Sequence, residues 1–204
     1  VQMLLVNNLS FFRNKIKIFE NLNLSLSNKQ IIQIKGKNGS GKTTFLQTVL
    51  NILEPKSGEI FWEGKNIKKN IFDLYNHTTF IMDQNTSTRE LTVLDNINFW
   101  HGLSSSKLVR DDLSLLLKTL DLEKYQKTKV MYLSSGEIKK LELLRLIIEQ
   151  RKLWVLDEPY NHLDDLSIEI LNQTFFDHLN NDGMIIFASH FNPSIVNLET
   201  IDLS

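Results

Sequence analysis

The chain has 204 residues, of which 42% are hydrophobic and 23% charged, so it is long enough for one folded domain with a sizeable core. Its 23 basic and 24 acidic side chains nearly cancel, which argues against a nucleic-acid-binding surface, and the lack of cysteine excludes disulfides and thiolate metal sites. No apolar run approaches the roughly 18–20 residues of a membrane span, and the first residues lack the basic start of a signal peptide. We therefore expect a single domain that, if it serves a membrane, does so from the surface.

The N-terminal part of the chain predicts three strands. The apolar run 3–6 predicts one strand, the alternating apolar residues of 16–26 predict the second, and the apolar run 30–34 predicts the third. Between the first two strands, residues 11–15 form a predicted turn that carries two aromatic side chains, Phe11 and Phe12. These two fit equally well as buried aromatics or as a flat surface on which adenine stacks.

The third strand leads directly into a glycine-rich loop. Residues 36–44 fit the phosphate-loop pattern G-x-x-x-x-G-K-S/T, between a strand and an amphipathic helix. Glycines let successive backbone N–H groups face an anion, and the helix adds its positive N-terminal end. Lys42 is expected to reach the β- and γ-phosphates, and the Thr43 hydroxyl to bind Mg²⁺. A chance glycine-rich turn is the alternative, but it leaves the fixed positions of the pattern unexplained. The predicted nucleotide-binding residues of the loop are Gly36, Lys37, Asn38, Gly39, Ser40, Gly41, Lys42, Thr43 and Thr44.

Strands and helices alternate through the rest of the chain. The further strands are predicted at 59–65, 78–82, 153–156 and 183–188. The helices are predicted at 42–54, 91–100 (with Thr92 as its N-cap), 108–120, 138–150 and 164–181. Leucine and isoleucine dominate residues 86–133, which we interpret as a small helical insertion. Helices that alternate with buried strands predict an α/β fold with a mainly parallel sheet.

Two adjacent carboxylates, Asp157 and Glu158, follow the predicted strand 153–156. In open α/β sheets ligands bind beyond the carboxyl ends of the strands, so this pair is expected beside the phosphate loop. Asp157 would hold Mg²⁺ through its water, and Glu158, on the other side of the pleat, would point at an attacking water. A pair that only caps the next helix is the alternative, and the phosphate loop upstream favours the catalytic interpretation.

Together, these motifs resemble the ATP-binding subunit of ABC transporters, and the resemblance covers nearly the whole chain. The stretch 133–137, Leu-Ser-Ser-Gly-Glu, is similar to the family signature Leu-Ser-Gly-Gly-Gln, and Gln84 stands where the family has its Q-loop. The stretch 161–164, with Asp164 as its defining acid, resembles the D-loop. His190 is similar to the switch histidine, and Phe12 to the adenine-stacking aromatic. The remaining histidines, interpreted as ordinary surface or loop residues, are His77, His101, His162 and His178.

The resemblance implies a P-loop NTPase core with a mainly parallel sheet, an N-terminal antiparallel β subdomain and an inserted α-helical subdomain. Residues 1–204 would form one ATP-binding domain, with the nucleotide-binding core at 1–85 and 136–204 and the helical subdomain at 86–135. The ligands implied are ATP and Mg²⁺. The catalytic residues implied are Lys42, Gln84, Glu158 and His190. Further nucleotide-binding residues implied are Ser134, Ser135, Gly136, Glu137 and Asp164, and the metal-binding residues are Thr43, Gln84 and Asp157.

A head-to-tail pair of identical chains is also implied, because the family uses the signature to grip the γ-phosphate bound to the opposite protomer. The chain carries one set of motifs, so two copies are needed for complete sites. Ser135 stands where the family has glycine and puts a side chain close to a phosphate. Glu137 replaces a glutamine and is expected to accept hydrogen bonds from ribose hydroxyls.

Within the family, the chain is most similar to the ATP-binding subunits of the cytochrome c maturation haem exporter. The features in common are the short length and the local sequences of residues 90–100, 153–159 and 183–184. This resemblance implies ATP hydrolysis that drives haem export or releases haem from a haem-carrying chaperone, with integral membrane permease subunits of the CcmB and CcmC kind as partners and no nucleic acid. The chain would sit on the cytoplasmic face of a bacterial inner membrane or the matrix face of a mitochondrial one.

Other functions remain open at this level. One is the ATPase subunit of a different ABC transporter. Another is a non-transport ABC ATPase that acts on ribosomes or DNA, but such proteins usually have two nucleotide modules or long coiled coils. A small-molecule kinase would leave the signature unexplained.

Overall fold

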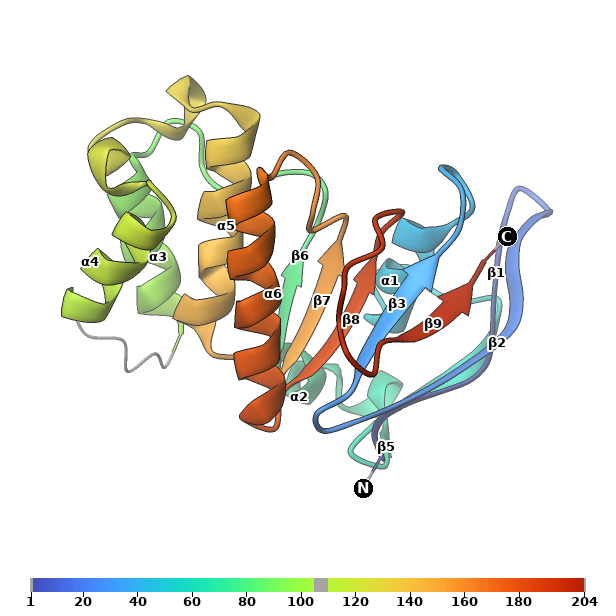
Figure 1. Ribbon diagram of the computed structural model, residues 1–204. Helices are drawn as coiled ribbons and strands as arrows, with labels where there is room; N and C mark the ends of the chain where they lie inside the picture. The colour runs from blue at the N-terminus through green and yellow to red at the C-terminus, as the bar shows by residue number, and fades with distance from the viewer. Residues whose placement is uncertain (1, 105–109, 204) are drawn as a thin grey trace.

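The computed structural model, which describes residues 2–104 and 110–203, places two β-sheets side by side with helices between and around them (Figure 1). The antiparallel sheet has the order β2-β1-β4-β5, formed by β2 (Ile16–Ser27), β1 (Gln2–Arg13), β4 (Ser57–Trp62) and β5 (Lys65–Asn66). The parallel sheet has the order β6-β7-β8-β3-β9, formed by β6 (Thr78–Ile81), β7 (Leu153–Asp157), β8 (Met184–Ala188), β3 (Ile31–Lys35) and β9 (Glu199–Asp202). The helices are α1 (Lys42–Val49), α2 (Ile71–Asn76), α3 (Val93–Leu103), α4 (Arg110–Thr119), α5 (Ser135–Glu149) and α6 (Asp165–Asn180).

The central strands of the parallel sheet are buried on both faces, which explains why β7 and β8 read as continuous apolar runs. Successive side chains of a strand point to opposite faces, so Leu153 and Val155 of β7 enter one core while Trp154 and Leu156 enter another. The first core contains the apolar face of α1, which lies between the two sheets. The second contains Phe175 of α6, on the opposite face. This arrangement holds the C-terminal ends of β3, β7 and β8 at one edge.

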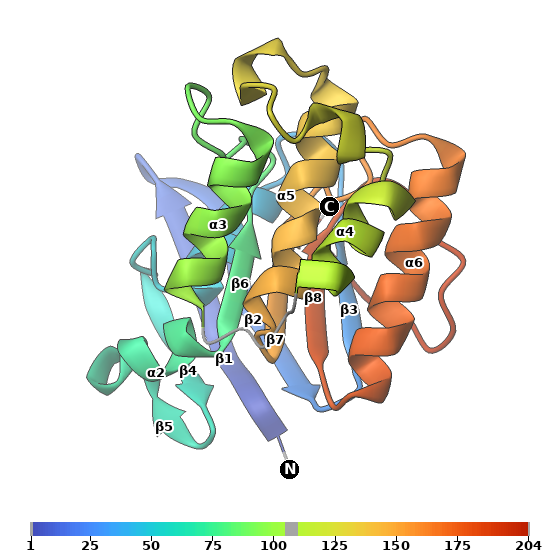
Figure 2. The same cartoon turned by 90° about the vertical axis from the view of Figure 1, so that its left-hand side faces the viewer.

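A third core joins α3 and α4 to α5, which stand together at the side of the molecule away from the antiparallel sheet (Figure 2). The insertion contributes Val93, Ile97 and Trp100 of α3 to it. Helix α5 serves two cores at once. It sends Leu141, Leu144 and Ile148 toward the insertion, and Leu143 and Leu146 toward the parallel sheet. Within residues 2–104 and 110–203, none of the helices has both the length and the apolarity that a bilayer span requires.

The predicted fold class is confirmed, including the mainly parallel sheet, the antiparallel sheet built on the N-terminal strands and the helical insertion. The N-cap predicted at Thr92 is also confirmed, because its hydroxyl accepts the Asp95 N–H and the Asp95 carboxylate accepts the Thr92 N–H. The predicted helix at 108–120 is confirmed over 110–119, while its first two residues lie outside the described ranges.

Several boundaries were wrong. The turn expected at 11–15 is only two residues long, because Asn14 and Lys15 both take positive φ angles (49° and 67°) and Phe11 and Phe12 stay in the strand. Helix α1 ends at Val49 rather than near residue 54, just before Asn51 takes a left-handed φ of 53°. Helix α2 and strand β9 were not predicted.

Candidate active site

The phosphate loop joins β3 to α1 at the C-terminal edge of the parallel sheet. Gly41 is the N-cap of α1 with a φ of 99°, and a Cβ there would overlap with the Ile18 side chain, so only glycine fits. Lys42 is 7% exposed, and its Nζ donates hydrogen bonds to the carbonyl oxygens of Gly36 (3.0 Å) and Lys37 (3.3 Å). The ammonium group therefore lies inside the curve of the loop, where it would face a bound phosphate.

Asp157, the last residue of β7, meets the start of α1 across the sheet edge. The Thr43 hydroxyl donates a 2.7 Å hydrogen bond to Asp157 Oδ2. Asp157 is 2% exposed, and burial raises the pKa of its carboxyl, an effect that the Thr43 hydrogen bond opposes. Its other oxygen, Oδ1, is buried and has no hydrogen-bond partner among the described residues. A buried acceptor without a partner is costly, so this oxygen is available to a ligand or a metal-bound water.

Glu158 sits beyond the end of the strand in a left-handed conformation, with a φ of 46°. Such a backbone conformation is strained for a residue with a Cβ and persists only where surrounding contacts hold it. Its N–H donates to the Ala188 carbonyl at the end of β8, and its Oε2 accepts the Ser189 hydroxyl (3.1 Å). The same oxygen lies 3.1 Å from His190 Nδ1, while Oε1 lies 3.7 Å from Lys42 Nζ. The carboxylate is thus held between a cation and a histidine, facing the phosphate loop.

These groups line one hollow of about 440 Å³. The predicted site residues that line it are Asn38, Gly39, Gly41, Lys42, Thr43, Thr44, Asp157, Glu158 and His190. Four further residues that we did not predict as site residues also line it, namely Arg13, Ile18, Asp83 and Asn161. Asn161 donates a hydrogen bond to Asp83 Oδ1 (3.3 Å), which connects the loop after β7 to the loop after β6.

Asp83 carried a usable signal, because it follows the predicted strand 78–82 just as Asp157 follows its own strand. Arg13 and Ile18 carried none, since they reach the hollow only through the hairpin of β1 and β2. Phe12, in that hairpin, pairs with Lys17 and does not line the hollow, and neither does Gln84. The roles assigned to Phe12 and Gln84 stay predictions.

The signature residues lie at the N-terminus of α5, outside this hollow. Ser134 caps the helix, and its own N–H donates a 2.7 Å hydrogen bond to the Glu137 carboxylate. In this conformation, Glu137 closes the cap of its own helix. A Cβ on Gly136 would lie 2.9 Å from the His162 carbonyl, so the signature is packed directly against the D-loop.

The D-loop is tied to α5 by charge as well. Asp164 caps α6 by accepting hydrogen bonds from the Ser167 N–H (2.8 Å) and hydroxyl (2.6 Å), and its other oxygen lies 3.0 Å from Lys140 Nζ. The Ser167 and Lys140 hydrogen bonds lower the pKa of Asp164 to about 2. The acid expected to define the D-loop is therefore ionised at neutral pH and fixes the start of α6 against α5.

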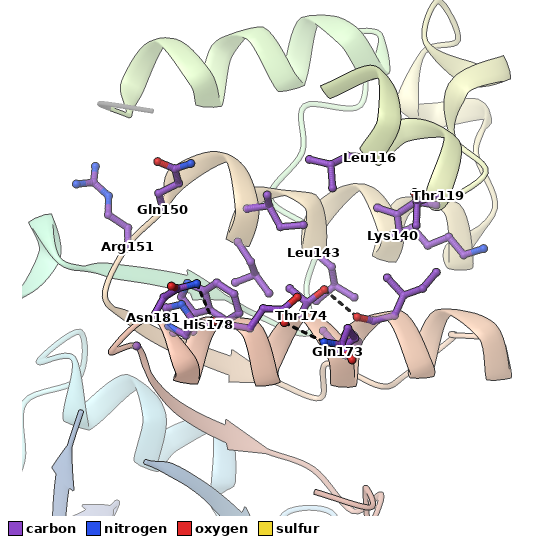
Figure 3. Close-up of a pocket in the computed structure, with 18 of the residues that line it drawn as sticks. Leu116, Thr119, Lys140, Leu143, Gln150, Arg151, Gln173, Thr174, His178 and Asn181 are labelled. Carbon is purple, nitrogen blue, oxygen red and sulfur yellow. Dashed lines mark hydrogen bonds between the residues drawn. The ribbon is translucent and has the colours of Figure 1, made fainter. Parts of the chain in front are cut away.

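A larger cavity of about 800 Å³ lies away from the phosphate loop, between α4, α5 and α6 (Figure 3). Its walls include the apolar side chains of Leu116 and Leu143, and no phosphate-loop residue lines it. His178, which we expected to be an ordinary surface or loop residue, lies at this cavity on α6 and stacks on Trp154 with ring centroids 3.6 Å apart and planes 5° apart. That expectation was wrong.

A family model described as "ABC transporter" matches residues 19–161. The chain belongs to the ABC transporter family. This confirms the resemblance inferred from the motifs, and the chain is an ABC-type ATPase. Two solved structures share its fold. One is an ATP-binding subunit of an ABC transporter (TM-score 0.82, 21% identity, 93% of this chain and 80% of that one). The other is a nucleotide-free ATP-binding cassette (TM-score 0.76, 20% identity, 100% and 88%).

Three bacterial relatives of this ABC ATPase carry the name cytochrome c biogenesis ATP-binding export protein CcmA. The protein from Vibrio vulnificus strain YJ016 is 31% identical over 188 residues, which cover 92% of both chains. The protein from Dechloromonas aromatica is 32% identical over 188 residues with the same coverage. The protein from Idiomarina loihiensis is 35% identical over 196 residues, covering 96% of this chain and 89% of its own.

Proposed function

We propose that the chain is the ATP-hydrolysing subunit of a membrane complex in c-type cytochrome biogenesis, where hydrolysis drives haem export or the release of haem from a chaperone. The observation that supports this is the extent of the similarity to the CcmA proteins, at 31–35% identity over about nine-tenths of both chains. The catalytic hollow supports the ATPase half of the proposal independently.

In the proposed reaction, the loop N–H groups and Lys42 bind the β- and γ-phosphates of ATP. Glu158 accepts a hydrogen bond from the attacking water, which then adds in line to the γ-phosphorus as the bond to ADP breaks. His190, 3.1 Å from the same carboxylate, orders that water or contacts the γ-phosphate. The Ser189 hydroxyl and the left-handed backbone fix the direction of the Glu158 side chain.

The donor set at the end of β7 fits Mg²⁺. Thr43 and Asp157 offer a hydroxyl and a carboxylate, and Asp157 Oδ1 is a buried oxygen without a partner. Gln84 is proposed as a further ligand from its loop. Among the described residues, no three His, Cys, Asp or Glu side chains are close enough to hold a metal by themselves, which matches an ion held mainly by phosphates and water. When bound, the ion would neutralise charge that develops on the phosphate oxygens.

We also propose that two copies pair head to tail. The signature residues Ser134, Ser135 and Gly136 lie outside the chain's own hollow but at a helix N-terminus, which suits the γ-phosphate of an opposite protomer. Residues 86–135 would then act as a helical subdomain that passes the closing motion from the core of 1–85 and 136–204 toward a membrane partner. The third core packs α3 and α4 of this part against α5, so a movement of α5 would carry them with it.

Membrane permease subunits, of the CcmB and CcmC kind, are the proposed partners at the cytoplasmic or matrix face of the membrane. Large apolar side chains exposed on short helices support a protein-binding surface. Phe72 of α2 is 77% exposed, and Phe99 and Leu103 of α3 are 56% and 68% exposed. The last two lie on the proposed helical subdomain, so a permease bound there would sense its movement.

The experiment is a membrane pull-down with tagged Glu158→Gln in ATP, which should hold the closed dimer, with wild type in ADP as the matched control. Small polytopic subunits together with haem-handling proteins support the proposal. Recovery of a different permease would show that the chain serves a transporter with another cargo. Ribosomal or DNA-bound proteins without a membrane subunit would overturn the transport function altogether.

A further inference from the structure

One face of α5 carries a buried stripe of charge. Lys139, Glu142, Arg145 and Glu149 recur at spacings of three, three and four residues, which places them on one side of the helix. Lys139 is 3% exposed and Glu142 is 1% exposed, and the side chains of Arg145 and Glu149 are 14% and 15% exposed. The charges alternate in sign along the stripe. This face is turned toward β6 and the segment that follows it.

Glu142 binds that segment with an unusually full set of hydrogen bonds. Its Oε1 accepts the N–H groups of Thr86 (2.8 Å) and Ser87 (2.5 Å), and its Oε2 accepts the Thr86 hydroxyl (2.7 Å). Arg145 Nη1 lies 3.6 Å from Glu142 Oε2 and donates to the same Thr86 hydroxyl (2.6 Å). Hydrogen bonds to an ionised acceptor are shorter and stronger than neutral ones, so this is a firm attachment.

The insertion holds the segment from its other side. Asn96 of α3, which is 1% exposed, accepts the Thr88 N–H (2.7 Å) and donates to the Thr88 carbonyl (3.1 Å). The Arg145 guanidinium also lies over the ring of Trp100 on α3, 5.3 Å from its centroid. Residues 86–88 are therefore gripped between α5 and α3. They begin two positions after Gln84, while α5 begins at the signature.

A buried carboxylate is a poor way to gain stability alone, because removing its charge from water costs free energy that an apolar side chain of similar volume avoids. What the Glu142 carboxylate provides is a fixed position for the segment, since breaking these bonds would leave both the carboxylate and two backbone amides buried without hydrogen-bond partners. We propose that Glu142 is a positioning residue for ATP hydrolysis, which locks residues 86–88 to the signature helix so that Gln84, two positions earlier, and Ser134 shift as one unit when nucleotide binds. This rests on the proposed roles of Gln84 and the signature.

The test compares Glu142→Ala with Glu149→Ala. Both variants remove a carboxylate from the same face of α5, but Glu149 accepts the Thr79 hydroxyl of β6 (2.7 Å) and reaches residues 86–88 only indirectly, through Arg145, whose Nε and Nη2 donate to it (3.0 and 2.9 Å). Steady-state ATPase kinetics and amide hydrogen exchange at residues 86 and 87 are measured for each. For Glu142→Ala, kcat is expected to fall about tenfold, as loss of a charged hydrogen bond implies, with KM changed by less than about threefold. The two amides should exchange faster. Glu149→Ala should leave the amides protected and kcat within about twofold of wild type.

A milder variant guards against misfolding. Thr86→Val removes only the hydroxyl shared by Glu142 and Arg145, and kcat should fall about threefold while both amides keep their acceptor. Faster exchange in Glu142→Ala with an unchanged kcat would overturn the positioning role, as would equal kinetic losses in both alanine variants. If the proposed active site were wrong, Glu158→Gln would hydrolyse ATP at the full rate. Hydrogen exchange at residues 86 and 87 would still report whether Glu142 holds this segment.

Discussion

His178 should make the fold sensitive to mild acid. Its ring stacks on Trp154, and its other face is so close to Gly183 that a Cβ there would overlap the ring. Burial lowers the pKa of His178 to about 4, against about 6.5 for an exposed histidine. Below pH 6.5 the unfolded chain binds a proton that the folded chain rejects, so the free energy of unfolding falls as the pH drops from 6.5 toward 4. Linkage with these two pKa values gives a loss of about 2 kcal/mol between pH 7.5 and pH 5.

The assay is urea unfolding of wild type and His178→Phe at several values between pH 7.5 and pH 5, followed by tryptophan fluorescence. Phenylalanine keeps a ring against Trp154 and cannot titrate. The difference between the two stability curves isolates His178, because every other titrating group is common to both proteins. The wild type should lose about 2 kcal/mol more than the variant over this range. Parallel curves would refute the reasoning.

Three further predictions concern the active site. Glu158→Gln should lower the ATPase rate at least about 100-fold while ATP still binds, and near-normal hydrolysis would reject the role assigned to this carboxylate. Gly41→Ala should weaken binding of a fluorescent ATP analogue and cost more than about 1 kcal/mol in urea unfolding, because φ is 99° and the Cβ overlaps Ile18; unchanged binding would contradict this. Asp164→Ala should cost about 1 kcal/mol by removing the cap of α6. The pKa of Asp164 is lowered to about 2, so the difference in thermal stability between this variant and wild type should be constant above about pH 4 and shrink as the pH falls toward 2. A difference that persists at pH 2 would show that the ionisation of Asp164 is irrelevant to the cap.

The parts of the site that the sequence predicted are those determined by residues close together in the chain. The phosphate loop is a continuous motif, and Asp157 and Glu158 directly follow an apolar strand, so their meeting at one sheet edge follows from parallel topology. Thr92 was predicted as a cap for the same reason, since a capping box spans only four residues.

The parts that escaped prediction depend on contacts between distant segments. Arg13 reaches the hollow because a two-residue turn at Asn14 and Lys15 extends the hairpin, and that turn has none of the glycine usual at such positions. His178 is buried by Trp154, 24 positions earlier, and helical periodicity alone does not reveal it. Glu142 was not singled out from the sequence, because nothing near it in sequence shows that residues 86 and 87 will cover it.

Because α5 contributes to both the second and the third core, its late position in the chain affects folding during synthesis. On the ribosome, chains emerge from the N-terminus, so residues 93–119 of the insertion appear well before residues 135–149 of α5. Until α5 arrives, Trp100 and its apolar neighbours on α3 lack the wall that later covers them. The apolar face of the nascent insertion is thus exposed for the time needed to synthesise about 30 residues, roughly 2–6 seconds at ordinary translation rates. The same helix that carries the signature therefore ends the interval in which this apolar face of the insertion is uncovered.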